Sequence, residues 1–321
     1  MRKVFFVVTA ILFGIAPAFA AEGPSIAGPI GGTDIRSALL PPPGFYAGGI
    51  FVRADAFDFV DGNGQPIAAL SQARLKRIVG APVIAYVPNV NVLGGSIGFA
   101  AVMPIGRQCG RLFAFEMKSC ESGLGDPYIE AMWSRSFGTV RPSRYPSALP
   151  IVEGLTIAFA FGAVIPVGQY DATNITTRAL STGNNIWDFA PSVAVTYTTP
   201  PILFEGTEFS AKAYLNNYIE NPATRYKTGA LVNIDFAISE RIGRLQAGLA
   251  GFYAFQIADD KLFGVPVLPD GQQVKALSIG PLVSYDMPEY GTTMKAKLLR
   301  TIDVTNTANS YGLVLSFFKK L

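Results

Sequence analysis

Hydrophobic and polar residues alternate along much of the chain, in segments of about 11 to 15 residues, longer than the roughly five or six residues of an average strand. In Lys227–Glu240, for example, Val232 and Ile234 alternate with Asn233 and Asp235. This period of two predicts strands with one apolar and one polar face. The expected strands, about twelve in all, are Gly44–Asp58, Arg74–Pro88, Val92–Gly106, Gly123–Phe137, Leu155–Val167, Asn185–Thr199, Glu208–Glu220, Lys227–Glu240, Leu245–Ala258, Gln273–Asp286, Thr292–Val304 and Ser310–Phe318.

The length of these strands favours a membrane barrel over a soluble β-sandwich, which would show the same alternation. Aromatic residues recur near the ends of the segments, as in the interfacial girdles of outer-membrane barrels. Short connections alternate with long loops, which matches short periplasmic turns and longer extracellular loops. We therefore predict an all-β fold, a closed antiparallel transmembrane barrel at residues 44–321. The predicted girdle residues are Phe45, Trp133, Trp187, Tyr197, Tyr253 and Tyr285.

The chain begins with a segment typical of export. Arg2 and Lys3 precede an apolar run, and Ala18-Phe19-Ala20 fits the small-x-small cleavage rule. We expect a signal peptide at residues 1–20, with a membrane anchor as the alternative. Residues 21–43 are rich in Gly and Pro and predict a flexible periplasmic lead-in, part of which could fold into the pore.

Composition supports a membrane location. Hydrophobic residues make up 50% of the chain and charged residues only 15%. Beyond the signal peptide no apolar run is long enough for a membrane helix, and a closed barrel is the other structure that satisfies its backbone in lipid. The whole chain has 26 basic and 23 acidic residues. Without Arg2 and Lys3 of the signal peptide, 24 basic and 23 acidic residues remain, a net charge of +1. This balance offers no basic patch for nucleic acid.

Histidine is absent from the sequence, which excludes a Ser-His-Asp hydrolase and a His-ligated metal site. A Ser-Lys pair is the enzyme arrangement that remains open. We expect no enzyme activity, cofactor or metal. The two cysteines, Cys109 and Cys120, predict a loop disulfide in an exported protein, with two free thiols as the alternative.

Two short segments of the chain resemble known local motifs. Gly123-x-Gly125 is no phosphate loop, because neither a helix nor a Walker lysine follows it. The segment Ser310–Phe317 fits the C-terminal pattern of outer-membrane barrels at Gly312, Leu315 and Phe317, although four residues follow it. An ordinary edge strand is the alternative for this segment.

Three stretches resemble the outer-membrane family named for the meta-pathway of phenol degradation. They are Gly44-Phe45-Tyr46, Gly123–Tyr128, and Gly183–Trp187 followed by Pro191 and Tyr197. The resemblance implies an outer-membrane barrel tied to uptake of aromatic or other hydrophobic compounds. It carries over no catalytic residues.

The polar faces of the strands supply candidates for the barrel lumen. Their mixed charges could line a hydrated pore or pair across a narrow lumen and close it. A hydrophobic solute could instead use an aromatic lining near Phe99, Phe113 and Phe115. The lumen candidates are Arg53, Asp55, Glu130, Lys212, Asn233, Asp235, Lys295, Lys297 and Asp303.

These observations predict a passive channel in the bacterial outer membrane for small hydrophobic or aromatic compounds. A structural or adhesive barrel with a plugged lumen and a soluble periplasmic β-protein are the alternatives. The expected partners are the lipid bilayer, the barrel assembly machinery and small hydrophobic or aromatic solutes.

Overall fold

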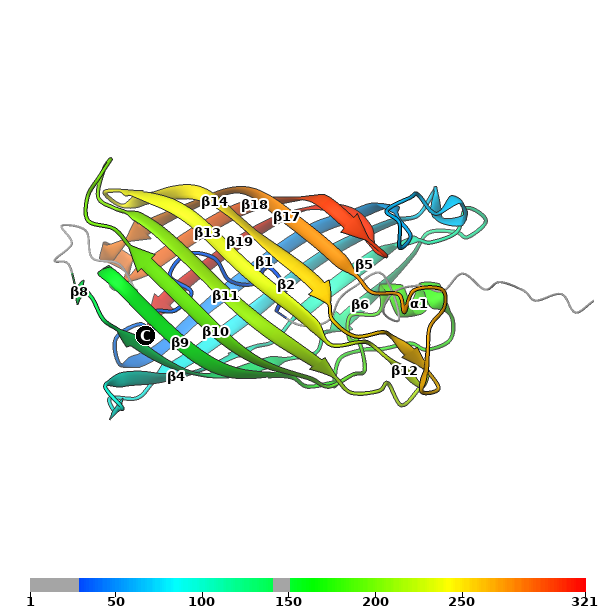
Figure 1. The fold of residues 1–321 in the computed structure, drawn as a ribbon, viewed down its shortest axis with the longest axis horizontal. Helices are drawn as coiled ribbons and strands as arrows, with labels where there is room; N and C mark the ends of the chain where they lie inside the picture. The colour runs from blue at the N-terminus through cyan, green and yellow to red at the C-terminus, as the bar shows by residue number, and fades with distance from the viewer. Residues whose placement is uncertain (1–28, 141–150) are drawn as a thin grey trace, which may run out of the picture.

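The computed structural model describes residues 29–140 and 151–321. The predicted signal peptide, the start of the lead-in and part of the connection after the fourth expected strand lie outside these ranges. Antiparallel strands form one sheet that closes on itself, because β19 pairs with β1 (Figure 1). The barrel has twelve strands, counting each of two interrupted strands once and leaving out short flanking pieces. The predicted fold class is confirmed.

Ten strands are continuous: β1 (Gly44–Phe59), β2 (Arg74–Val87), β9 (Val152–Val164), β10 (Asp188–Thr198), β11 (Thr207–Tyr218), β13 (Leu231–Ile242), β14 (Leu245–Gln256), β17 (Lys275–Met287), β18 (Thr292–Thr305) and β19 (Ala308–Lys320). The two interrupted strands are β4 (Gly95–Val102) with β5 (Ile105–Arg111), and β6 (Ser119–Leu124) with β7 (Tyr128–Ser136). The short elements are β3 (Asn91–Val92), β8 (Thr139–Val140), β12 (Tyr226–Lys227), β15 (Lys261–Leu262), β16 (Val265–Pro266), α1 (Ile175–Leu180), η1 (Ala68–Leu70) and η2 (Pro288–Tyr290). Of the described residues, none forms a helix long and apolar enough to cross a membrane.

Each interruption contains a proline, Pro104 in one strand and Pro127 in the other. Proline has no backbone N–H, so it cannot donate to the hydrogen-bond ladder of a central strand. β2 therefore pairs with β4 along one part and with β5 along another. Both strands are longer than predicted. The expected third strand ends at Arg111 rather than Gly106, and the expected fourth strand begins at Ser119 rather than Gly123. Consequently Cys109 and Cys120 lie opposite each other on paired strands rather than in a loop.

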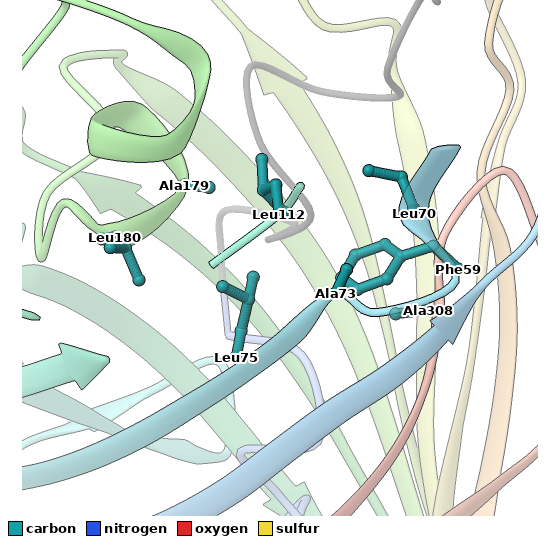
Figure 2. Packing of buried hydrophobic residues seen from close by; sticks show 8 residues of the cluster. All are labelled: Phe59, Leu70, Ala73, Leu75, Leu112, Ala179, Leu180 and Ala308. Atoms are coloured by element: carbon teal, nitrogen blue, oxygen red, sulfur yellow. The ribbon is translucent and has the colours of Figure 1, made fainter. Parts of the chain in front are cut away.

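The long loops gather at the end of the barrel opposite the C-terminus (Figure 1). There the stretch Gly168–Gly183, which connects two of the expected strands, contains helix α1. Asn174 caps this helix by accepting hydrogen bonds from the backbone N–H groups of Thr176 and Thr177. A buried apolar cluster ties the helix to the ends of β1, β2 and β19 (Figure 2) and comprises Phe59, Leu70, Ala73, Leu75, Leu112, Ala179, Leu180 and Ala308.

Residues 29–43, here called the lumen segment, lie inside the barrel rather than beside it (Figure 1). Ile30 packs against a cluster that includes Leu231 and Ala254 of β13 and β14. Further along, Leu40 lies so close to Gly98 of β4 that a Cβ at Gly98 would stand 2.5 Å from the leucine Cδ2. The segment thus crosses the lumen before it enters β1.

Candidate functional site in the barrel lumen

The lumen segment is held by buried polar side chains of the barrel wall. Asp235 of β13 accepts hydrogen bonds from the backbone N–H of Gly31 and of Thr33, both at 2.8 Å, and from the Thr33 hydroxyl at 2.9 Å. The Asn233 side chain donates to the same carboxylate at 2.8 Å. Because Asp235 is only 1% exposed, these donors replace the water that it loses by burial.

Two lysines of β18 bind the segment from another side. Lys297 Nζ lies 3.1 Å from Asp34 Oδ2 and donates to the Gly31 carbonyl oxygen at 2.8 Å. Lys295 Nζ contacts the other oxygen of Asp34. One segment carboxylate thus faces two wall lysines, which satisfies charges that would be costly to bury alone.

A further ion pair spans the lumen without the segment. Lys212 Nζ of β11 lies 2.8 and 2.7 Å from the two carboxylate oxygens of Glu130 on β7. The Tyr128 hydroxyl donates to Glu130 at 2.7 Å. Strands β9 and β10 separate β7 from β11 in the sheet, so the pair is a chord across the barrel interior.

The C-terminal end of the barrel carries a third polar network. Arg36 of the segment donates its backbone N–H to Glu208 at 2.6 Å. Its guanidinium lies 3.9 Å from Asp286, which also pairs with Arg241 at 2.9 Å. Gln246 links Glu208 to Arg241 through its amide group. The segment is therefore anchored by charged groups at both Asp34 and Arg36.

Beside these polar networks, part of the lumen is mainly apolar. A cavity of about 300 Å³ lies between the lumen segment and the wall. Its polar lining includes Glu130, Lys295 and Lys297, and its apolar lining includes Ile50, Val83, Ala85, Val87, Ala100, Met132 and Val314. The interior thus combines ion-paired networks with a cavity whose wall is mainly apolar.

The structure brings together most of the predicted lumen residues. Glu130, Lys212, Asn233, Asp235, Lys295 and Lys297 all face inward, and all of them take part in the hydrogen bonds described above. Arg53 and Asp55, in contrast, lie on the outward face of β1. They share that face with Phe45 and Phe51, which are 61% and 39% exposed.

Asp303 also lies outside the lumen, although its distance in sequence from Lys295 and Lys297 predicts an inward position. The register of β18 against β17 shifts between the pairs Thr301–Ser278 and Asp303–Leu277. Such a β-bulge inserts one residue and reverses the alternation that follows it. The Asp303 carboxylate instead pairs with Lys275 at 2.9 Å, and both side chains are largely exposed.

The predicted girdle residues lie on the outward face of the barrel. Phe45 stacks on Tyr86 with ring centroids 4.4 Å apart, and Trp133 stacks on Phe159 at 6.0 Å. Trp187, Tyr197 and Tyr285 are 40 to 44% exposed, and the partly exposed Tyr253 pairs with Leu277 of β17.

The C-terminal pattern falls on β19, the strand that closes the barrel against β1. Gly312, Leu315 and Phe317 pair with Ala54, Phe51 and Gly49. The strand continues to Lys320, so the residues after Phe317 belong to the wall as well.

Cys109 and Cys120 form a disulfide between β5 and β6. The aromatic lining suggested near Phe99, Phe113 and Phe115 does not form in the lumen. Phe99 pairs with Tyr86 on the outward face, and Phe113 and Phe115 stack on each other beyond the strands. Of the described residues, no three cysteine or carboxylate side chains gather into a metal-binding group.

Sequence reasoning missed Asp34, Arg36 and the carboxylate Asp126. One signal in the sequence could have indicated the first two. Asp34 and Arg36 are charged residues two positions apart in a stretch otherwise rich in Gly and Pro, and the predicted inner face of a later strand carries lysines that could pair with a carboxylate. Asp126 belongs to the Gly-Asp-Pro motif, but its partners lie in a distant loop: it accepts hydrogen bonds from the backbone N–H of Gly168 and of Asn184.

A family profile described as "Putative MetA-pathway of phenol degradation" matches residues 54–317. The chain belongs to this family. The resemblance seen in the sequence is thereby confirmed. No curated protein matches the sequence.

Among solved structures, the COG4313 outer membrane channel from Pseudomonas putida F1 is similar, with a TM-score of 0.71 and 15% identity over 90% of this chain and 100% of that one. The beta domain of the Bordetella autotransporter BrkA has a TM-score of 0.49 and 11% identity, over 87% and 99% of the two chains. The first likeness shows that this chain has the fold of that outer-membrane channel. With its closed wall and outward apolar face, the protein is an outer-membrane barrel.

Proposed function

We propose that this family member is a passive channel for small hydrophobic or aromatic compounds, and that the solute passes along the apolar half of the lumen beside the lumen segment. The single observation that carries the proposal is the cavity of about 300 Å³ between the segment and an aliphatic wall. Its volume is at the lower end of the range of small-molecule pockets. The family description and its link to phenol degradation support an aromatic solute.

The polar half of the lumen has a different role in this proposal. Its hydrogen bonds hold the lumen segment against β11 and β13, and its ion pairs hold the segment against β18, so that the apolar side stays open. No catalytic step is involved, because transport through such a cavity needs only a path and a concentration gradient.

The experiment narrows the cavity without changing its charges. Ala100 of β4 lines the cavity, and its neighbour Ala101 faces the lipid side of the same strand. We expect Ala100→Phe to reduce uptake of a labelled aromatic compound by porin-deficient cells that express the full chain. Ala101→Phe is the matched control, because it adds the same ring outside the barrel, and it should leave uptake unchanged.

Both variants must first migrate as folded barrels on unboiled gels. Equal uptake by folded wild type and folded Ala100→Phe would contradict the proposal. It would favour the alternative of a structural barrel whose lumen stays plugged.

A further inference from the structure

Basic side chains gather on the outward face of β1, β2 and β5. Arg53 and Lys76 have side chains that are 60% and 66% exposed, and Arg107 is exposed on the adjoining strand. Beside them, Tyr311 of β19 pairs with Asp55 of β1, and its ring lies 5.6 Å from that of Phe57. Aromatic residues of this kind mark the membrane–water interface, so the basic cluster lies at the level of the lipid headgroups of the outer leaflet.

The charge of this cluster is not balanced within the protein. Asp55 is its one carboxylate, and it is shared by Arg53 at 3.9 Å and Lys76 at 3.6 Å. No carboxylate of the described residues forms an ion pair with Arg107, nor with Arg300, which follows on the other side in β18. Positive charges on a lipid-facing surface are costly unless they reach anionic groups at the interface.

An apolar groove of about 740 Å³ begins directly below the cluster on the same outward face. Phe51 and Ile105 form its upper walls, two residues before Arg53 and Arg107, and Phe317 bounds it further down. Gly80 lies between the upper walls, where an added Cβ would have nothing within 4 Å. From Arg53 to Gly49 the strand rises roughly 13 Å, at about 3.3 Å per residue, which suits an extended acyl chain.

We propose that this surface binds a phosphorylated, acylated glycolipid of the outer leaflet, the lipid A part of lipopolysaccharide. The guanidinium groups of Arg53 and Arg107 bind its phosphates, since arginine recognises phosphate through paired charge-assisted hydrogen bonds. One acyl chain lies in the groove over Gly80. The inference concerns the outside of the barrel and does not depend on what passes through the lumen.

The test measures binding of purified bisphosphorylated lipid A to the full chain refolded in detergent, by native mass spectrometry. We expect the double variant Arg53→Gln/Arg107→Gln to weaken binding by about tenfold or more, the effect of losing one or more charge-assisted hydrogen bonds. Gly80→Leu should weaken it as well, because the new side chain occupies the open groove. Lys261→Gln, which removes an exposed charge in the short strand β15, should have no effect.

Two further probes identify which part of the lipid matters. Phosphatidylethanolamine supplies acyl chains without net charge, and inorganic phosphate supplies the anion without acyl chains; both should bind far more weakly than lipid A. Binding of phosphatidylethanolamine as tight as that of lipid A would overturn the role of the arginines. If inorganic phosphate displaced lipid A completely and Gly80→Leu bound lipid A as tightly as the wild type, the surface would be a phosphate site and not a lipid site. If all folded variants bound lipid A equally well, the lipid would not bind at this surface.

Discussion

Asp126 accepts the backbone N–H of Asn184 at 2.6 Å, although 58 residues separate them in the chain. Each residue belongs to one of the motifs by which the sequence resembles its family, Gly-Asp-Pro at 125–127 and Gly-Asn-Asn at 183–185. The same carboxylate accepts the N–H of Gly168 at 2.8 Å. The two motifs therefore form one structural unit. Asp126, in the interruption between β6 and β7, holds the loop between β9 and β10 in place through these hydrogen bonds.

We predict that Asp126→Ala loosens this loop and lowers the free energy of unfolding by about 2 kcal/mol, because it leaves two partly buried backbone N–H groups without their acceptor. Asp126→Asn should have a smaller effect, since it keeps one acceptor oxygen. The measurement is the temperature at which the barrel loses its fast mobility on unboiled gels, together with proteolysis of residues 165–187. Asp171→Ala changes an exposed-loop aspartate of the same region as a control, and an equal effect there would contradict the special role of Asp126.

The ion pair across the lumen should show strong coupling. We expect Lys212→Met to destabilise the barrel by about 3 kcal/mol, because the largely buried Glu130 would remain without its cation. The double variant Lys212→Met/Glu130→Leu should lose less than the two single variants together. Urea unfolding in detergent, followed by tryptophan fluorescence, measures the three values. Additive losses would mean that the two side chains act independently.

The position of the lumen segment should control ion flow. Asp34 is the segment carboxylate that pairs with both Lys295 and Lys297. Asp34→Asn should therefore weaken the binding of the segment to the wall and raise single-channel conductance in planar bilayers. Asp303→Asn is a matched control, because it also removes a carboxylate from a lysine pair but lies outside the lumen. Conductance that stays at the wild-type value in Asp34→Asn would show that the segment is held by its other contacts.

The disulfide should stabilise only the outer end of one hairpin. Cys109 and Cys120 are already opposite each other on paired strands, and the loop that they close is short. In Cys109→Ser/Cys120→Ser, local opening of this hairpin should therefore become easier by at most about 3 kcal/mol, while global unfolding of the barrel keeps its free energy. We expect faster proteolysis within residues 112–118 and an unchanged urea midpoint for the barrel. A large drop of that midpoint would show that the hairpin supports the whole wall.

The sequence predicts well those features that depend on the local backbone. Because side chains alternate across an extended chain, apolar positions such as Ile234 and polar ones such as Asp235 identify strands and their two faces. Strand length and aromatic residues at strand ends then distinguish a membrane barrel from a sandwich. For the same reason six of the nine lumen candidates face inward.

Where the alternation is ambiguous or broken, the sequence does not suffice. The face of β1 with Arg53 and Asp55 also carries phenylalanines, and only the closed barrel shows that it points outward. One bulge residue near Asp303 reverses the pattern, and a bulge leaves no reliable mark in a single sequence.

The sequence by itself thus determined the class of fold, the membrane and most of the inner polar face, since these follow from periodicity and composition. Only the tertiary structure decided which charges meet. Asp34 binds lysines more than 260 residues away, and Glu130 reaches Lys212 across the lumen. Such contacts depend on strand register and barrel closure, which set distances through space that no spacing along the chain records.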